Sequence, residues 1–237
     1  MVKNKVKLRV KQETGFQFDE AIKTLRTNIQ FCGANIRTIM VTSTLPEEGK
    51  STMSFEIARA MALMGKKVIL IDADIRRSTM AAKYQIDNPV PGLSQYLSGQ
   101  HELEDGLICE TDIPDLDVIF SGPYAPNPAE LLEEPALDKL IAWCREEYDY
   151  CIIDTPPLSS VIDGAIIAPK CDGAVLVVAS GKVSYPLVQK AKAQLEKTGC
   201  RILGAVLNKI DTKKGGYYYN KYGSYYKHYG DYYGGEK

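Results

Sequence analysis

Residues 37–53 read RTIMVTSTLPEEGKSTM and combine an apolar β-branched run, a turn-rich loop that ends in Gly49, Lys50 and Ser51, and a helix-like segment. In a phosphate-binding loop (P-loop), backbone N–H groups point at the phosphates and the following helix adds the positive end of its dipole. The lysine reaches the outer phosphates, and the next hydroxyl binds Mg²⁺. The order of residues therefore predicts a nucleotide phosphate site. The match to G-x-x-x-x-G-K-[ST] is imperfect, because Thr44 stands where the first glycine belongs.

Apolar runs alternate with segments of helical periodicity, which predicts an α/β fold with a doubly wound, mostly parallel sheet. With 237 residues, of which 45% are hydrophobic, the chain can form a three-layer sandwich of the P-loop NTPase kind. The β-branched runs suit strands that are buried on both faces. Strands are predicted at 37–43, 67–73, 116–121, 149–154, 173–179 and 201–207. Helices are predicted at 51–64, 135–148, 160–168 and 185–198. Residues 85–130, rich in Pro and Gly, are expected to hold small helices and irregular connections.

The two ends of the chain are basic, although the formal net charge is −1. Five basic residues precede the first acid, Glu13: Lys3, Lys5, Lys7, Arg9 and Lys11. Two interpretations stay open for residues 1–15, namely a solvated, mobile end or a docking strip for an acidic partner or an anionic membrane surface. Nucleic acid is not expected as a partner, because no basic stripe with interleaved aromatic residues appears inside the domain.

The apolar runs are far too short for a bilayer span, and no apolar signal-peptide core follows the N-terminus. This pattern predicts a cytoplasmic protein. The six cysteines are scattered without a Cys-x-x-Cys pair, and there are two histidines. Small buried thiols are therefore expected rather than structural zinc or a disulfide framework.

Acidic residues follow two of the predicted strands. Asp72 and Asp74 come after residues 68–71, and Asp154 comes after residues 151–153. A single aspartate at such a place is commonly a turn or helix cap. Next to a P-loop, however, phosphoryl transfer needs Mg²⁺ held by the loop hydroxyl and a carboxylate, and a group that deprotonates or orients the nucleophile. Ser51 and Asp154 fit the metal site, and the pair Asp72 and Asp74 supplies a candidate base and a second metal contact in an order that stays open.

Residues 208–211 read Asn-Lys-Ile-Asp, the form Asn-Lys-x-Asp with which many GTPases read guanine. Against a GTPase, Asp154 is followed by Thr-Pro-Pro rather than by the Asp-x-x-Gly of such switches, and the first P-loop glycine is missing. A plain polar turn after a strand is the other alternative. Asn208 remains a candidate for contact with the base, whichever base that is.

From Gly215 onward the composition changes to Gly, Tyr, Lys, Asn and Ser without Val, Ile or Leu, so the folded domain is expected to end near Asp211. Nine tyrosines fall within seventeen residues: Tyr217, Tyr218, Tyr219, Tyr222, Tyr225, Tyr226, Tyr229, Tyr232 and Tyr233. Such a segment cannot form a packed core and is expected to be disordered. It can be a sticky low-complexity tail, an aromatic interaction patch or, beside a nucleotide site, a set of phosphoryl acceptors. Each phosphate would add about −1.5 to −2 charges.

Together these motifs resemble the bacterial tyrosine kinases of capsule and exopolysaccharide synthesis, in the form that is a separate cytoplasmic protein in Gram-positive bacteria. The resemblance covers nearly the whole chain. It rests on residues 42–52, on Asp72-x-Asp74-x-Arg76, on the run IIDTPP at 152–157, on residues 121–132 and on the tyrosine cluster.

The resemblance implies ATP as the donor with Mg²⁺, Asp72 or Asp74 as the activator of the acceptor phenol, and activation by a transmembrane adaptor of polysaccharide export. It also implies a ring-shaped homo-oligomer of the unphosphorylated protein, a cognate tyrosine phosphatase, and a peripheral location at the inner face of the membrane through the adaptor. The kinase domain would span 16–211, between the basic segment 1–15 and the tail 212–237. The implied nucleotide-binding residues are Thr44, Glu48, Gly49, Lys50, Ser51, Thr52 and Asn208, the implied metal ligands are Ser51, Asp74 and Asp154, and the implied catalytic residues are Lys50, Asp72 and Asp74.

One departure from the family pattern concerns assembly. Members typically carry Glu-x-x-Arg-x-x-Arg near the N-terminus, and Glu20, Lys23 and Arg26 stand there in this chain. Their spacing places them on one helical face, where they can contact a neighbouring subunit or simply form a surface ion pair of little worth. Lysine does not replace arginine in bidentate contacts, so ring assembly is expected to be weaker.

Two other function classes stay open. The related membrane-cycling ATPases share the architecture but carry a second lysine early in the P-loop, where this chain has Leu45. A GTPase switch is supported by residues 208–211 alone.

Overall fold

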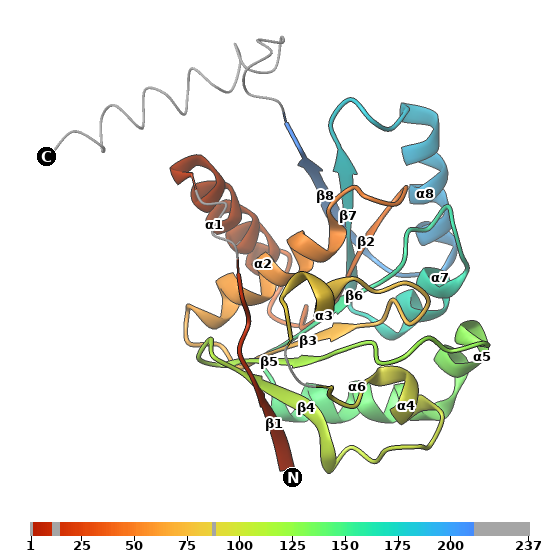
Figure 1. The fold of residues 1–237 in the computed structure, drawn as a ribbon. Helices are drawn as coiled ribbons and strands as arrows, with labels where there is room; N and C mark the ends of the chain where they lie inside the picture. Colours follow the sequence, from red (N-terminus) through yellow and green to blue (C-terminus); the bar gives the residue numbers. More distant parts are fainter. Residues whose placement is uncertain (1, 11–14, 87–88, 211–237) are drawn as a thin grey trace, which may run out of the picture.

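An eight-stranded sheet with helices on both faces forms the centre of the molecule (Figure 1). The structure, a computed structural model, describes residues 2–10, 15–86 and 89–210. Within the sheet the strands follow the order β1-β4-β5-β3-β6-β2-β7-β8, and every neighbouring pair is parallel except β4 and β5. The strands are β1 (Val2–Val6), β2 (Thr38–Ser43), β3 (Val68–Asp72), β4 (Asp105–Thr111), β5 (Leu116–Ile119), β6 (Tyr150–Asp154), β7 (Gly173–Ala179) and β8 (Ile202–Asn208).

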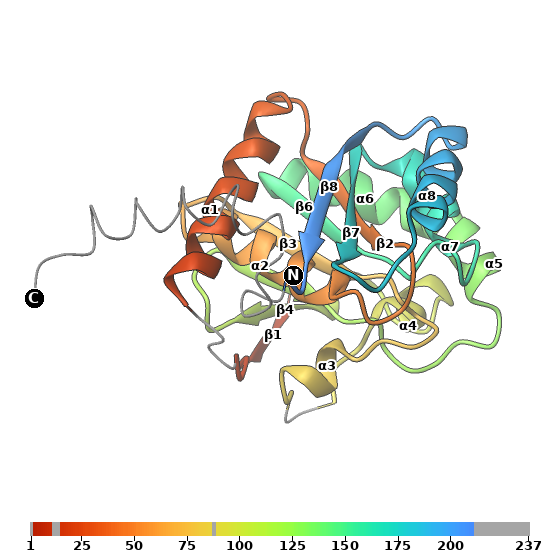
Figure 2. The same ribbon diagram turned by 90° about the horizontal axis from the view of Figure 1, so that it is seen from above.

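The helices form two outer layers, so the α/β three-layer sandwich predicted from the sequence is confirmed. One face carries α1 and α2, and the other carries α6, α7 and α8 (Figures 1 and 2). The helices are α1 (Phe16–Phe31), α2 (Lys50–Ala62), α3 (Met80–Lys83), α4 (Leu93–Leu97), α5 (Pro128–Glu133), α6 (Pro135–Glu147), α7 (Asp163–Ile167), the 3₁₀ turn η1 (Ala168–Lys170) and α8 (Tyr185–Lys197). None of the helices in the described residues is both long and apolar enough to cross a membrane.

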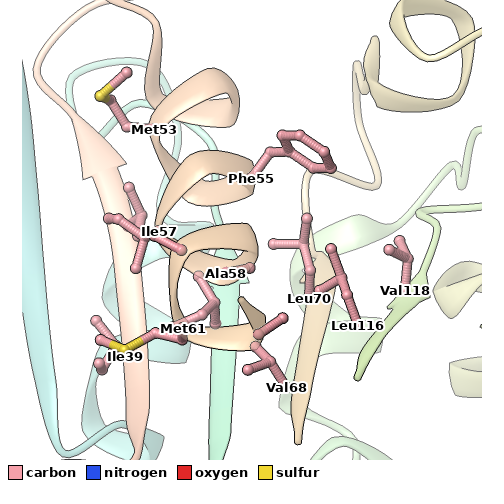
Figure 3. Packing of buried hydrophobic residues seen from close by; sticks show 14 of the residues in the cluster. Ile39, Met53, Phe55, Ile57, Ala58, Met61, Val68, Leu70, Leu116 and Val118 are labelled. Atoms are coloured by element: carbon pink, nitrogen blue, oxygen red, sulfur yellow. The ribbon is translucent and has the colours of Figure 1, made fainter. Parts of the chain in front are cut away.

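The central strands are apolar throughout because both of their faces are covered. In β3, Val68 and Leu70 belong to the hydrophobic cluster under α1 and α2, whereas Ile69 and Ile71 belong to the cluster on the opposite face. Figure 3 shows side chains of α2, including Phe55 and Ile57, directed onto the first of these clusters. Each fully buried side chain of this size contributes about 1.5–3 kcal/mol, so these layers hold the strands in place.

The strand order brings the expected site together. β2 lies between β6 and β7, and β3 lies next to β6. Asp72, the last residue of β3, is paired in register with Asp154, the last residue of β6. Parallel strands present their carboxyl ends at one edge of the sheet, so the P-loop after β2 and the two acidic strand ends share that edge.

All six strands expected from the sequence are present, with ends that shift by one or two residues. The structure adds β4 within the region that was expected to be irregular. Its apolar centre is only three residues long, Leu107–Ile108–Cys109, and Gly106 has a φ of 84°, so the strand signal is weak in the sequence. β4 pairs with β5 through only two residue pairs, in the antiparallel direction.

The structure also differs from expectation at the N-terminal basic residues, where the sequence analysis placed no strand. Residues 2–6 form β1, which pairs with β4 at one edge of the sheet. Lys3 Nζ lies 2.5 Å from Asp117 Oδ2, and the same oxygen accepts a hydrogen bond of 2.6 Å from the hydroxyl of Tyr148. The ring of Trp143 meets the ring of Tyr148 edge to face, with 5.8 Å between centroids. Basic residues of this segment therefore take part in the folded sheet rather than forming a freely solvated end.

Candidate active site

The P-loop connects β2 to α2 through residues 44–49. Gly49 has a φ of +92°, in the left-handed region, and a Cβ at this position would collide with Asn208 Nδ2. The conformation therefore favours glycine, and any other residue would also have to displace the Asn208 amide. Glu47 also has a positive φ, of 62°, which L-residues other than Asn, Asp and Gly seldom adopt. The loop is thus held in a specific shape by its surroundings.

The segment after β6, part of the IIDTPP motif and the residues that follow it, braces the beginning of the P-loop. Leu158 N donates to Ser43 O at 2.9 Å, and Ser159 N donates to Thr44 O at 3.2 Å. Thr42 Oγ1 donates to Pro156 O at 3.0 Å. Thr44, which stands in place of the first glycine, is buried, and its hydroxyl has no hydrogen-bond partner within the described part of the chain. The IIDTPP motif and the residues after it therefore support the backbone of the P-loop.

Lys50, the first residue of α2, directs its ammonium group into a cluster of acids. Its Nζ lies 3.2 Å from Asp74 Oδ2, 3.5 Å from Asp154 Oδ2 and 3.2 Å from Ser51 Oγ. Only 12% of the lysine side chain is exposed. Burial alone lowers the pKa of Lys50, but the carboxylates of Asp154, Asp74 and Asp72 outweigh burial and raise it above its usual value. The lysine is therefore the internal counter-ion of the acids.

Asp154 lies at the bottom of this cluster. Its side chain is 1% exposed, and Ser54 Oγ donates to its Oδ1 at 2.8 Å. Burial raises the pKa of Asp154, whereas the charge of Lys50 and the hydroxyls of Ser51 and Ser54 oppose that rise. Ser54 was not among the residues predicted for the site. The sequence feature that could have identified Ser54 is its spacing from Lys50, since it lies one helical turn later and on the same side of α2.

Asp72 and Asp74 have different surroundings. Asp72 is almost fully buried, Ser78 Oγ donates to its Oδ2, and the backbone N–H of Asp74 donates to its Oδ1 at 3.3 Å. Burial and, next, the charge of Asp154 raise the pKa of Asp72 to about 7. Asp74 lies closer to the surface, contacts Lys50 and accepts a hydrogen bond of 3.1 Å from Arg77 N. Asp74 is therefore the acid that faces Lys50, and Asp72 is the acid with a pKa near neutrality.

Arg76 holds the loop that carries these acids against α7. Its guanidinium donates two hydrogen bonds to Asp163, of 2.7 Å from Nε to Oδ2 and 2.8 Å from NH2 to Oδ1. Asp163 is completely buried. A bidentate pair of this kind fixes orientation as well as distance. Arg76 was part of a sequence motif without an assigned role, and Asp163 was not predicted at all.

The remaining predicted nucleotide-binding residues lie around the P-loop. The carboxylate of Glu48 is buried and accepts hydrogen bonds from Leu45 N at 2.6 Å and Ala179 N at 2.8 Å. Asn208 Nδ2 donates to Glu48 O at 2.9 Å. Thr52 Oγ1 accepts a hydrogen bond of 2.6 Å from Lys83 Nζ. The structure thus brings Lys50, Ser51, Asp74 and Asp154 into direct contact and places Glu48, Thr52 and Asn208 in contact with other groups of the loop, α3 and the strand ends.

The predicted assembly residues of α1 do not all face the same way. Glu20 and Lys23 form an exposed ion pair of 2.7 Å. Arg26 turns toward α2, where its NH1 lies 3.4 Å from Ala60 O and its Nε is buried without a hydrogen-bond partner among the described residues. The predicted acceptor tyrosines, 217–233, and Asp211 lie outside the described residues.

The candidate metal ligands are all oxygen atoms, those of Ser51, Asp74 and Asp154, which is the set that Mg²⁺ prefers. Within residues 2–10, 15–86 and 89–210 there is no cluster of three or more His, Cys, Asp or Glu side chains that forms a ready-made metal cage. Mg²⁺ commonly keeps several waters and binds through one or two carboxylates together with substrate phosphates.

Comparisons with known proteins agree with this geometry. A family model described as "AAA domain" matches residues 36–186. Tyrosine-protein kinase CpsD of Streptococcus agalactiae is 43% identical over 205 residues, which cover 86% of this chain and 87% of that protein. Tyrosine-protein kinase CpsD of Streptococcus pneumoniae is 45% identical over 208 residues, which cover 86% of this chain and 91% of the relative.

Solved structures give the same result. The chimerical protein CapA2B2 has a TM-score of 0.79 and 33% identity over 89% of this chain and 94% of its own. The kinase domain of Escherichia coli tyrosine kinase ETK has a TM-score of 0.78 and 30% identity over 86% of this chain and 89% of its own. The septum site-determining protein MinD of Pyrococcus horikoshii, solved with Mg-ADP, has a TM-score of 0.62 at 24% identity over 72% of this chain and 69% of its own, and shares the fold.

Proposed function

Since the chain belongs to the family of bacterial tyrosine-protein kinases, we propose that it transfers the γ-phosphoryl group of ATP to tyrosines in the tail of a neighbouring copy and thereby regulates capsular or exopolysaccharide synthesis. The observation that carries this proposal is the position of Lys50. Its ammonium group lies at the start of the helix after the P-loop, between Asp74 and Asp154. A phosphate cradle, a metal site and a base are thereby within reach of one another.

The P-loop N–H groups and the N-terminus of α2 bind the phosphates, and Lys50 turns from the carboxylates to the outer phosphates as the nucleotide enters. Ser51, Asp74 and Asp154 would hold Mg²⁺, which neutralises charge on the β- and γ-phosphates when bound. Ser54 orients Asp154 through its 2.8 Å hydrogen bond. These groups hold the γ-phosphorus for attack from the side opposite the leaving ADP.

Asp72 is the proposed base. It accepts the proton of the acceptor phenol as the phenolic oxygen forms a bond to the γ-phosphorus and the bond from that phosphorus to the β-phosphate oxygen breaks. A pKa of about 7 is close to that of an efficient general base at neutral pH. Asp74 contacts Lys50 directly and is assigned to the metal. The loop that carries both acids is fixed by the Arg76–Asp163 pair.

Transfer between copies is supported by the place where the tail begins. β8 ends at Asn208, beside the P-loop of the same subunit, and the first tyrosine of the tail, Tyr217, follows after a short stretch of sequence. Such a short connection leaves little room for nine successive phenols to approach their own γ-phosphate in line. In a ring, each tail lies at high effective concentration near the next active site. Accumulated phosphates then repel one another and loosen the ring. Glu20, Lys23 and Arg26 are the proposed contacts between copies.

Partners and location follow from the same proposal. A transmembrane adaptor of polysaccharide export activates the kinase and holds it at the inner face of the membrane, and a tyrosine phosphatase resets the tail. The similarity to the chimerical protein CapA2B2 supports a second protein component in such systems.

The test mixes two variants of the protein. One carries Lys50→Met and keeps its tail, and the other is active but lacks residues 212–237. With γ-labelled ATP, we expect the inactive subunit to acquire phosphotyrosine, as mapped by mass spectrometry. An unmodified inactive subunit, together with labelling of the intact kinase at a rate that is independent of concentration, would show intramolecular transfer instead. Parallel reactions with γ-labelled GTP test the donor, and preferential use of GTP would favour a GTPase.

A further inference from the structure

The ends of β7 and β8 are attached to the P-loop through three residues that we term the loop clamp: Glu48, Asn208 and Lys209. Glu48 supplies the first attachment. Its carboxylate oxygens accept one hydrogen bond from within the loop, from Leu45 N at 2.6 Å, and one from the end of β7, from Ala179 N at 2.8 Å. The residue is 2% exposed. A buried carboxylate is costly without such donors, so these two bonds tie the loop firmly to the sheet.

Asn208 and Lys209 supply the second attachment, from the end of β8. Asn208 Nδ2 donates to Glu48 O at 2.9 Å, and Lys209 Nζ donates to Glu47 O at 2.5 Å. The backbone of Asn208 is itself fixed, because its main-chain carbonyl oxygen accepts a hydrogen bond of 2.8 Å from Ser180 N. Its side-chain amide packs against Gly49 so closely that a Cβ there would collide with it.

These contacts determine where the loop's N–H groups point. In a trans peptide unit the C=O and the N–H lie in one plane and point in opposite directions. When Lys209 holds the carbonyl of Glu47, the N–H of Glu48 must point away from Lys209. When Asn208 holds the carbonyl of Glu48, the N–H of Gly49 must likewise point to the other side. Both N–H groups belong to the stretch that cradles phosphates in a P-loop.

We propose that Asn208 and Lys209, together with Glu48, are positioning residues for phosphoryl transfer, which orient the N–H groups of Glu48 and Gly49 toward the nucleotide phosphates. Asn208 and Lys209, the first two residues of the Asn-Lys-x-Asp motif, then serve the phosphate end of the nucleotide through the loop backbone rather than reading the base. This inference rests on the proposed nucleotide site at Lys50. It assigns a role to the sequence motif that otherwise suggested guanine recognition.

The decisive experiment uses a ligand without a base. Binding of Mg·ADP and of Mg·tripolyphosphate to the full-length protein is measured by calorimetry for wild type and Asn208→Leu, which keeps the approximate shape of the side chain and removes the donor. We expect both affinities to fall by the same factor, roughly three- to tenfold, as for the loss of one hydrogen bond. The ratio of ADP to GDP affinity should stay unchanged. In turnover, the KM for ATP should rise and kcat should fall.

Substitution of Lys209 needs a matched control, because it removes a positive charge near the phosphates as well as a hydrogen-bond donor. Lys182 is exposed in the loop after β7, and Lys182→Met makes the same change in charge as Lys209→Met. We expect Lys209→Met, but not Lys182→Met, to weaken the binding of both ligands, and Lys209→Arg to restore it, because arginine keeps a donor.

Several outcomes would overturn the loop clamp. Loss of ADP binding with unchanged tripolyphosphate binding in Asn208→Leu would make Asn208 a base-contacting residue. A lower melting temperature of the nucleotide-free protein with unchanged affinities would make the contacts merely structural. Equal losses of ligand affinity in Lys209→Met and Lys182→Met would mean that Lys209 acts only through its positive charge. A wild-type protein that binds neither ligand overturns the proposed nucleotide site and the clamp with it.

Discussion

Lys50 combines its proposed role in catalysis with a role in stability, because its buried ammonium group balances the charge of several acids. The sequence predicts only that this lysine binds phosphate. In the structure it already forms ion pairs with Asp74 and Asp154. Removing one member of a buried ion pair is strongly destabilising, since it leaves uncompensated charge behind.

We predict that Lys50→Met abolishes phosphoryl transfer and also lowers the melting temperature of the nucleotide-free protein. The deficit in melting temperature should shrink from pH 8 to pH 5, because Asp154 and Asp72, whose pKa values are already raised, take up protons and no longer need the cation. Thermal denaturation across this pH range checks the expectation. Lys182→Met serves as the control, and a deficit that is equal at pH 5 and pH 8 would contradict the role of Lys50 as a counter-ion.

Asp72→Asn should abolish turnover and yet stabilise the metal-free, nucleotide-free protein at neutral pH. The folded protein raises the pKa of Asp72 from 3.8 to about 7, so it keeps a proton that the unfolded chain releases between these values. The stability contributed by this proton is fully present below about pH 4 and is lost as the pH rises through 7. The gain from Asp72→Asn should therefore be larger at pH 8, where the carboxyl of the folded protein is ionised, than at pH 5.

Chemical denaturation in the presence of a chelator measures this gain. Asp115→Asn is the matched control, because Asp115 is exposed and its φ of 61° is one that asparagine tolerates. A gain that is larger at pH 5 than at pH 8 would show that the raised pKa of Asp72 is not the cause.

Single residues differed in how far the sequence revealed them. Lys50 and Ser51 could be predicted because a P-loop is built from consecutive residues. Asp154 could be predicted because it ends an apolar strand. Ser54 could have been inferred from helical spacing once β6 was known to lie beside α2. The Arg76–Asp163 pair joins residues 87 positions apart and has no local signal.

At the scale of elements, α1 carries an exposed ion pair on one side and a contact with α2 on another. Glu20 and Lys23 lie on its exposed side, whereas Arg26 is directed toward α2. We predict that Lys23→Ala changes the free energy of unfolding by less than about 0.5 kcal/mol but weakens self-association. Arg26→Ala should lower the free energy of unfolding by about 1 kcal/mol, through lost packing and a lost hydrogen bond.

Urea denaturation and sedimentation velocity separate these effects. Lys23→Arg is the informative counterpart, because it should strengthen association if a bidentate contact to the neighbouring copy is available. Unchanged sedimentation of both Lys23 variants would remove this residue from the contact between subunits.

The elements that the sequence analysis did not place show two different causes. In residues 5–10, KVKLRV, which include the end of β1 and the residues after it, apolar and polar residues alternate, and Val6 and Leu8 are buried while Lys5 and Lys7 are exposed. This is the period of a half-buried strand, so the sequence carries a local signal for extended structure at this end of the chain. β4 is different. Its apolar centre is too short to predict a strand, and its position depends on its neighbours β1 and β5.

For the molecule as a whole, the arrangement of the acidic cluster predicts that metal binding depends on nucleotide. Lys50 already lies close to Asp74 and Asp154, so a free cation would have to displace it. We predict that Mg²⁺ alone changes the melting temperature little, whereas Mg·ADP raises it by several degrees, as expected from a ligand at about 100 times its Kd, which adds about 2.7 kcal/mol.

Differential scanning fluorimetry with Mg²⁺, ADP with a chelator, and both together tests this dependence. Stabilisation by Mg²⁺ alone that equals the effect of Mg·ADP would mean that a complete metal site exists without phosphates.

The overall architecture was predictable as a class, and the strand order was not. Alternation of apolar runs and helical segments is enough to predict parallel strands with helices on both faces. The order β3-β6-β2-β7 depends on which crossovers pack best, and that order is what places Asp72 opposite Asp154. For the same reason the loop clamp, which joins β7 and β8 to the P-loop, could not be inferred from its own motif.

The edge-to-face contact between Trp143 and Tyr148 makes the intrinsic tryptophan fluorescence of the protein a probe of its folding. Trp143 is the single tryptophan, and its aromatic partner is hydrogen bonded to Asp117, which in turn is paired with Lys3. Trp143 lies on α6, Tyr148 directly follows that helix, and Asp117 and Lys3 lie on β5 and β1. Tyr148 packs in the hydrophobic cluster on the face of the sheet opposite α2. Emission from this indole should therefore respond to melting of that side and to detachment of β1, and should change little when a nucleotide binds at the P-loop. Intrinsic fluorescence thus reads out unfolding in this kinase, and ligand titrations need an extrinsic dye or calorimetry.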